Sequence, residues 1–258
     1  MKIVVLVKEV PDTYGDRKLS LETGLADRGA GENVLDEIGD RSLEVALSYA
    51  DKNPGTEVVV LSMAPESATA TVRKGLAMGA GSAVQVVDER LLGADLGLTA
   101  EVLAAAIKRS AFDLVIGGNL STDGSGGVIP AMVAELLDVA SVTNLNSVEI
   151  TATSVSGERS IDGGTAQVAA QLPAVISITE RLPEGRFPSF KGIMAAKKKP
   201  FETLTLDDLD VKADAPEWSR SIVVGLSERP PRQAGVKIVD EGDAGAQLAE
   251  FLIQNRLA

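Results

Sequence analysis

Four short runs of branched apolar residues alternate with segments of helical periodicity in the first half of the chain. This alternation constrains the fold most. The runs cover 3–7, 57–62, 83–87 and 113–116. Continuous Val, Ile and Leu runs of this length are typical of parallel strands buried on both faces. Alternation of strand and helix implies right-handed crossovers, so we expect an α/β fold with a doubly wound, mostly parallel sheet.

Helices are expected between these strands. Apolar residues at i, i+3, i+4 and i+7 predict the first one: Leu43, Ala46, Leu47 and Ala50. Pro65 is expected to open the second helix and Gly79 to end it, while Thr99 is expected to cap the third. A fourth helix is predicted over 128–137, directly after the last strand run.

The second half of the chain follows a different pattern. Short alternating segments separated by Gly and Ser run from about 146 to 172, which predicts a small antiparallel insertion. The apolar run 174–178 predicts a buried strand that returns to the main sheet. The polar segment 202–231 is expected to form an extended C-terminal arm with one strand-like run at 221–224. A closing helix would present Leu248, Phe251 and Leu252 on one face.

The chain contains no histidine and no cysteine, and its formal net charge is −12. The missing residue types exclude disulfides, thiolate nucleophiles, histidine triads and Cys- or His-ligated metals, so we expect no metal site. The acidic balance argues against nucleic-acid binding. The apolar runs are too short to span a membrane and Lys8 interrupts the first, so we expect a cytoplasmic protein without direct membrane insertion.

A basic stretch at 183–200 stands out in this acidic chain. Its cations are Arg186, Lys191, Lys197, Lys198 and Lys199, and no acidic residue lies among them. Phe187 and Phe190 lie within the stretch and Phe201 beside it, and its prolines and glycine disfavour a continuous helix through 186–192. Apolar side chains flanked by cations are typical of a loop that docks into a partner's groove. A solvated lysine cluster beside packed phenylalanines remains the alternative.

The segment 117–127, with the sequence GGNLSTDGSGG, follows the fourth strand run and leads into a helix. Its backbone N–H groups and the start of that helix are suited to bind phosphate, and Ser121, Thr122 and Ser125 add hydroxyl groups. It lacks a Walker lysine and the G-x-G-x-x-G spacing, which disfavours those kinds of nucleotide site. An ordinary flexible loop remains the alternative.

Two further cations are of interest. Lys8 follows the first strand run and is expected beside the glycine-rich loop if the first and fourth strands are neighbours. There it would meet a phosphate or cap the end of the strand. Arg73 is expected to pair with a surface acid.

Several motifs, in chain order, resemble the beta (small) subunit of electron-transfer flavoprotein. They are KIVVLVKEVPD, TVRKGLAMGA, GGNLSTDG, LPAVISI, GRFPSFKGIMAAKKK and RQAGVKI. The resemblance covers essentially the whole chain. It implies a fold like that of adenine-nucleotide alpha-hydrolases, with a nucleotide-binding α/β domain over 1–200. It also implies that the C-terminal arm and helix over 201–258 clasp an alpha subunit.

The resemblance implies a heterodimer in which the alpha subunit holds most of the FAD. Such a carrier takes electrons from acyl-CoA dehydrogenases and related flavoenzymes, as in fatty acid oxidation. It passes them to a membrane-associated electron-transfer flavoprotein:quinone oxidoreductase. The beta subunit binds a structural AMP, docks the dehydrogenase and is not itself an enzyme. In bifurcating members a second FAD takes the place of AMP, and we favour the AMP type for this chain.

The resemblance also assigns residues. The cofactor-binding set is Leu6, Val7, Lys8, Asp36, Ile38, Gly39, Met63, Asn119, Leu120, Ser121, Thr122, Asp123, Gly124, Ser125, Gly126, Gly127, Val128 and Ile129. The partner-docking set is Arg186, Phe187, Phe190, Lys191, Ile193, Met194 and Lys197. Phe190 stands where the family generally has an anchoring leucine. Thr13, Tyr14 and Ile38 are expected to border the flavin across the subunit interface.

The chain departs from the family at the phosphate loop. The family commonly carries a Gln before the Gly of this loop, whereas this chain has Gly127-Val128-Ile129-Pro130. Backbone donors survive this change, but side-chain contacts to a nucleotide are lost. Two rival functions use the same fold. A free-standing nucleotide-dependent hydrolase or ligase would have only Asp123 as an acid in the loop. A small nucleotide-sensing stress protein would leave the docking stretch and the arm unused.

Overall fold

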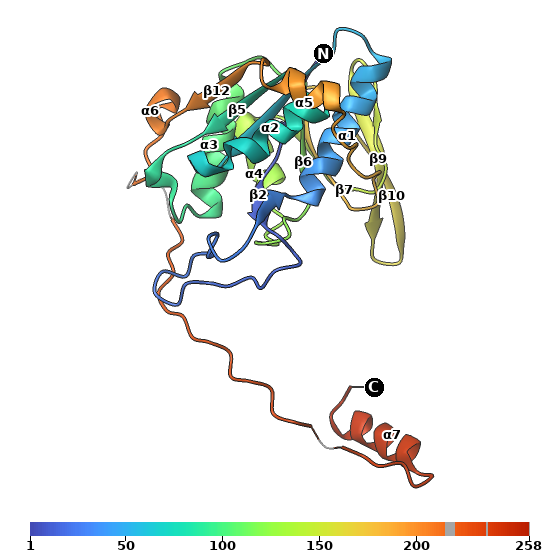
Figure 1. The fold of residues 1–258 in the computed structure, drawn as a ribbon. Coiled ribbons are helices and arrows are strands. Elements are labelled where there is room, and N and C mark those ends of the chain that lie inside the picture. The colour runs from blue at the N-terminus through green and yellow to red at the C-terminus, as the bar shows by residue number, and fades with distance from the viewer. Residues whose placement is uncertain (215–219, 236, 258) are drawn as a thin grey trace. The chain divides into compact units, whose positions relative to one another are not determined.

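The computed structural model describes residues 1–214, 220–235 and 237–257 of the chain. The expected arm therefore falls partly outside the described residues, at 215–219. The chain divides into two compact units, 1–224 and 225–258. The first unit carries a seven-stranded sheet with helices on both faces, and the described residues of the second unit contain one helix (Figure 1).

All seven strands of the central sheet are parallel, in the order β12-β5-β4-β1-β6-β11-β7. Their bounds are β1 Lys2–Leu6, β4 Glu57–Met63, β5 Ser82–Val86, β6 Leu114–Gly118, β7 Ala140–Leu145, β11 Ala174–Ile178 and β12 Phe201–Leu204. The expected α/β fold with a parallel sheet is thus confirmed. Strands β1 and β6 are neighbours, with Val4 in register with Val115.

Along the chain, each helix of the first unit follows one of these strands. They are α1 Glu37–Lys52, α2 Thr69–Met78, α3 Leu96–Lys108, α4 Ile129–Leu137, α5 Phe190–Ala196 and α6 Leu206–Leu209, with short 3-10 turns η1 Glu66–Ala68 and η2 Glu89–Leu91. Thr99 was expected to cap the third helix, but that prediction is wrong. Asp95 is the cap, because its side chain accepts the N–H of Leu98 at 2.8 Å, and Thr99 lies within the first turn.

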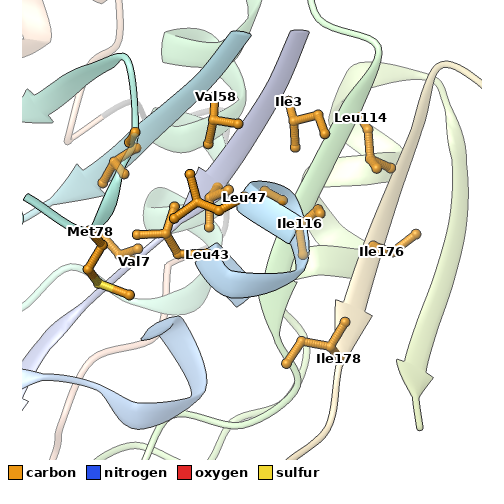
Figure 2. Close-up of a cluster of buried hydrophobic side chains, with 14 of the residues drawn as sticks. Ile3, Val7, Leu43, Leu47, Val58, Met78, Leu114, Ile116, Ile176 and Ile178 are labelled. Carbon is orange, nitrogen blue, oxygen red and sulfur yellow. The ribbon is translucent and has the colours of Figure 1, made fainter. Parts of the chain in front are cut away.

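Successive side chains of each strand point to opposite faces of the sheet, so they pack into two separate cores. Ile3 and Val5 lie with Leu43 of α1 in one cluster, whereas Val4 lies with Val102 of α3 and Val133 of α4 in the other. Figure 2 shows the first cluster between the strands and α1. Because both faces are covered, the inner strands of the sheet are largely apolar, which made them easy to predict.

Two strands of the central sheet were missed by the sequence reading. They are β7, a run with exposed Ala140 and Ser141, and β12, whose Glu202 and Thr203 are exposed. Both are edge strands, paired on one side only, and edge strands carry polar residues. The strand-like run at 221–224 forms no strand.

The antiparallel insertion is confirmed as a three-stranded sheet in the order β10-β9-β8. Its strands are β8 Glu149–Ile150, β9 Ser154–Ile161 and β10 Gly164–Gln171. Val155 of β9 is buried in the first core cluster, which ties the insertion to the main domain. A second small sheet joins β2 Glu9–Pro11 to β3 Asn33–Leu35. The second unit contains α7 Ala244–Gln254, the predicted closing helix.

Candidate functional site

The candidate site lies at the carboxyl ends of β1 and β6. From β1 the chain crosses to β4 on one side, whereas β6 lies on the other side, so the strand order reverses between them. In open α/β sheets this switch point is where ligands bind. Lys8 follows β1 and the glycine-rich loop follows β6, so the structure brings together the two segments predicted for the site.

Glycines beneath the loop allow the end of β6 to pack closely against neighbouring side chains. A Cβ on Gly118 would lie 2.5 Å from Cγ2 of Ile38, and one on Gly117 would lie 3.3 Å from Cγ of Pro130. The end of β6 therefore packs directly against the starts of α1 and α4. Gly39 is also close to Val7, because a Cβ there would lie 3.6 Å from the Cα of Val7. Ile38, expected to border a flavin, lies under Gly118.

Asp36 precedes α1 and is buried, with 1% of its surface exposed. Its Oδ2 accepts the backbone N–H of Thr122 at 2.9 Å. Its Oδ1 is buried and has no hydrogen-bond partner among the described residues. Burial raises the pKa of Asp36 above its usual range, against the opposing effect of the Thr122 N–H. A buried acceptor without a partner is costly, so this oxygen favours a ligand that donates a hydrogen bond.

Asp123 is the centre of a charge cluster in the loop. It meets Nζ of Lys8 at 2.7 Å and Nη2 of Arg28 at 3.3 Å, and it accepts the N–H of Gly124 at 2.6 Å. Burial opposes ionisation of Asp123, but the Lys8 ammonium and the hydrogen bonds from Ser121 and Gly124 together lower the pKa of the carboxyl. Lys8 therefore lies beside the loop as expected, but its charge is already paired.

The irregular segment between β2 and β3 folds against this loop through two arginines. Nη2 of Arg17 donates to Oγ1 of Thr122 at 3.1 Å and to the Pro11 carbonyl at 2.8 Å. Nη1 of Arg28 donates to the Glu9 carbonyl at 3.0 Å. The sequence reading missed both arginines, because nothing in a polar, irregular segment signals a long-range contact.

The start of α4 offers backbone donors. Its cap residue, Val128, has no side-chain capping bond, and Pro130 lies in the first turn. Within the described residues, the N–H groups of 126–129 make no hydrogen bond to the protein. Positive φ angles at Ser125 (49°) and Gly127 (70°) turn the loop into the helix. Unpaired N–H groups at a helix start are suited to bind an anion.

Other assigned residues lie at the same sheet edge. Leu6 ends β1, and Met63 ends β4, two residues beyond the Leu61 that is in register with Leu6. Asn119 begins the loop, where its side-chain oxygen accepts the N–H of Leu120 at 2.8 Å. Tyr14 is exposed, with 98% of its surface accessible. The described residues contain no cluster of acidic side chains that would hold a metal ion.

The basic stretch is partly committed to contacts within the chain. Arg186 binds Glu44 through Nε and Nη2, both at 2.8 Å, and Asp51 at 2.9 Å. These ion pairs attach the stretch to α1. Arg186, assigned to the docking set, is therefore held by acids of the same chain.

The stretch contains a short helix, α5. Ser189 caps it by accepting the N–H of Gly192 at 3.1 Å, so no helix continues back through Arg186, as expected. Phe187 and Phe190 are 95% and 80% exposed. The other exposed members of the docking set are Lys191, Ile193, Met194 and Lys197. Apolar side chains exposed this far mark a surface suited to a partner.

Arg73 does not pair with a surface acid, so that prediction is wrong. Its guanidinium lies 4.5 Å from the ring centroid of Phe201, and Nη1 donates to the Ala196 carbonyl at 3.2 Å. The neighbouring Lys74 instead pairs with an acid, Asp40, at 2.8 Å.

No helix among the described residues is long and apolar enough to cross a membrane.

The sheet and its switch point define an open, doubly wound α/β protein. The Electron transfer flavoprotein domain family matches residues 25–209. The chain is 44% identical to electron transfer flavoprotein subunit beta of Mycobacterium tuberculosis (strain ATCC 25618 / H37Rv), over 99% of this chain and 98% of that protein. It is 33% identical to the subunit beta of Bacillus subtilis (strain 168), over 98% and 96%.

A third relative is caffeyl-CoA reductase-Etf complex subunit CarD of Acetobacterium woodii. It is 32% identical, over 93% of this chain and 92% of that protein. The chain belongs to the electron transfer flavoprotein family, among its beta subunits. Membership implies an alpha-subunit partner and an FAD within the complex.

Proposed function

We propose that this beta subunit and its alpha partner form a cytoplasmic carrier that takes electrons from acyl-CoA dehydrogenases and related flavoenzymes. The carrier passes them to a membrane-bound electron-transfer flavoprotein:quinone oxidoreductase. The alpha subunit holds most of the FAD, which supplies the redox chemistry. The beta chain binds a structural AMP, docks the dehydrogenase and performs no catalysis of its own. The absence of His and Cys agrees with this role.

One observation supports the AMP proposal: the start of α4 has unpaired N–H donors, and buried Asp36 lies beside them. The N–H groups of 126–129 would hold the phosphate. The unpartnered Oδ1 of Asp36 would accept a hydroxyl or amino hydrogen of the nucleoside. The residues present thus fit a nucleotide at both its anionic and its hydrogen-bonding parts, without the side-chain glutamine common in the family.

The charge cluster limits how the nucleotide is held. Lys8 and Arg28 both point to Asp123, and Arg17 is hydrogen-bonded to Thr122 and Pro11, so the side-chain donors nearest the loop already have partners. The phosphate is therefore left to backbone donors and the helix dipole. Backbone donors make fewer charge-assisted bonds, so we expect AMP to bind less tightly here than at a site with free lysines.

Docking of the dehydrogenase is proposed for the exposed face of α5 and the residues before it. Phe187 and Phe190 are almost fully exposed and have no packing role in the first unit. Lys191 and Lys197 lie at the rim. An apolar anchor with a basic rim fits an apolar groove with acidic residues around it, because anchors give affinity and rim charges speed association.

The arm and the second unit are proposed to clasp the alpha subunit. Within this arm, Nη2 of Arg220 binds Glu101 at 2.7 Å, and the N–H of Ser221 donates to Asp95 at 2.6 Å. Asp95 caps α3 and Glu101 lies within it. Beyond them, Ile222 and Val224 are exposed, at 79% and 92%.

The first experiment is to co-purify the chain with its alpha subunit, denature the complex and quantify the released nucleotides. One FAD and one AMP per heterodimer support the proposal. Two FADs without AMP place the protein among the bifurcating carriers, with the second flavin at 119–129. No flavin overturns the carrier function, and ATP turnover by the isolated chain supports a hydrolase instead.

The second experiment tests docking with Phe190→Asp in the heterodimer. Electron transfer from an acyl-CoA dehydrogenase should fall about tenfold or more, because an unpaired carboxylate in an apolar groove costs several kcal/mol. Flavin spectra and thermal stability should not change, since Phe190 is exposed. Ile161→Asp, at the exposed β9–β10 turn, is the matched control and should transfer normally. Unchanged transfer by Phe190→Asp removes this residue from the interface.

A further inference from the structure

Helices α2 and α5 cap each other's C-terminal ends. Arg73 of α2 donates from Nη1 to the carbonyl of Ala196, the last residue of α5, at 3.2 Å. Lys199, three residues after α5, donates from Nζ to the carbonyls of Leu76 at 2.9 Å and Ala80 at 2.6 Å, at the end of α2. Carbonyls at helix ends lack partners within the helix and attract cations. The end of α5 thus receives a cation from α2, and the end of α2 receives one from the segment that follows α5.

Arg73 also contacts the strand after α5. Its guanidinium lies over the ring of Phe201, the first residue of β12, which pairs with β5 at the edge of the central sheet. This distance is within the range of a cation–π contact. Gly192 completes the packing, because a Cβ there would lie 2.3 Å from the carbonyl oxygen of Ala77. The α5 backbone therefore lies directly on α2.

Helix α5 needs this support. It has seven residues, and only Ala196 among them is buried. A helix this short is not stable in water by itself, and an apolar face turned to solvent adds no packing. Its order must come from the start, where Ser189 caps it, and from the contacts that Arg73, Lys199 and Gly192 make with α2.

We propose that Arg73 and Lys199 are positioning residues that hold α5 in its docking-competent conformation. This inference rests on the proposed docking function of α5. It separates Lys199 from the other lysines of the basic stretch, because its ammonium is bound to carbonyls at the end of α2 while Lys198 is exposed. Pre-ordering the docking helix lowers the entropy lost on binding, so its loss should weaken docking without changing the flavin.

The test uses the heterodimer with Arg73→Met and Lys199→Met, which keep the unbranched stems and remove the donors. Lys198→Met removes the same charge one residue away and is the control for long-range attraction. Lys199→Arg keeps the donors. Amide hydrogen exchange over 190–196 reports the order of α5, and steady-state electron transfer from an acyl-CoA dehydrogenase gives KM and kcat separately.

Exchange over 190–196 should become about tenfold faster in both Met variants, since bonds to charged groups are the strong ones. KM for the carrier should rise several-fold with kcat unchanged, and Lys199→Arg should restore both. Lys198→Met should leave exchange as in the wild type. Unchanged exchange in Arg73→Met and Lys199→Met overturns the proposal, as does faster exchange with an unchanged KM. Electron transfer by Phe190→Asp at the wild-type rate overturns the docking function itself. The exchange measurement distinguishes this failure from failure of the positioning role, because it reports the order of α5 without a docking partner.

Discussion

The backbone N–H of Thr122 donates to Oδ2 of Asp36 at 2.9 Å, across 86 residues of sequence. This bond joins the glycine-rich loop after β6 to the start of α1. It also fixes the carboxylate in a buried position where Oδ1 has no partner among the described residues. One side chain therefore both shapes the loop and presents an unsatisfied acceptor to the site.

Asp36→Asn should alter how stability depends on pH. Burial raises the pKa of Asp36, so the native state binds its proton more tightly than the unfolded state does. The unfolding free energy of the wild type must then fall as pH rises from about 4, the unfolded pKa, through the raised pKa. Above that window the loss is constant, because the carboxylate is then ionised in both the native and the unfolded state.

The asparagine variant has no such proton, so its unfolding free energy should rise relative to that of the wild type across this window. Urea unfolding at a series of pH values checks this, with Asp162→Asn at the exposed β9–β10 turn as the control. A difference between Asp36→Asn and wild type that does not grow with pH contradicts the expectation.

Asp123→Asn should loosen the attachment of the irregular segment 15–31 to the loop, because Arg28 loses its acidic partner. The carboxylate holds Lys8 and Arg28, and both cations are more than one-third exposed, so screening reduces the effect to about 1–2 kcal/mol. Proteolysis within 15–31 should therefore become faster in the variant. Added salt should speed cleavage of the wild type and have less effect on Asp123→Asn. Glu22→Gln, an exposed change in the same segment, should cleave like the wild type.

The fold could be predicted because its central strands are buried on both faces. Runs such as 57–62 carry the signal alone, and five of the seven sheet strands were found from it. The edge strands β7 and β12 carry polar residues on exposed positions, and no periodicity separates such strands from coil. They are defined by pairing with β11 and β5, which is a tertiary property.

The site could be predicted in position more than in detail. Lys8 and the loop each follow a strand of the sheet, so both lie at the carboxyl ends of the strands. They are close together because β1 and β6 are neighbours. Nothing local indicates that Asp123 takes the charge of Lys8, or that Arg17 and Arg28 reach the loop from the irregular segment. Those contacts join segments about a hundred residues apart, and a single sequence does not show which charged side chains meet.

Gly192→Ala should displace α5 from α2. The added methyl would lie 2.3 Å from the Ala77 carbonyl oxygen, and backbone cannot give way as a side chain tip does. Overpacking of this kind costs about 1–3 kcal/mol, although alanine is itself the better helix former. Amide exchange over 190–196 should speed up while the core sheet stays protected. Gly164→Ala, where a Cβ meets nothing within 4 Å, should leave α5 unchanged.

Charges on the apolar face of α7 should weaken the heterodimer. Leu248 and Phe251 are 53% and 50% exposed, and an eleven-residue helix with an exposed apolar face is marginal by itself. The alpha subunit is the partner that would cover this face, so Leu248→Asp with Phe251→Asp should raise the dissociation constant at least about tenfold. Gln247→Asp with Gln254→Asp adds the same charge to positions that are already polar and should change it little. Equal dissociation constants for the two double variants, measured by sedimentation or titration, would show that α7 does not contact the alpha subunit through its apolar face.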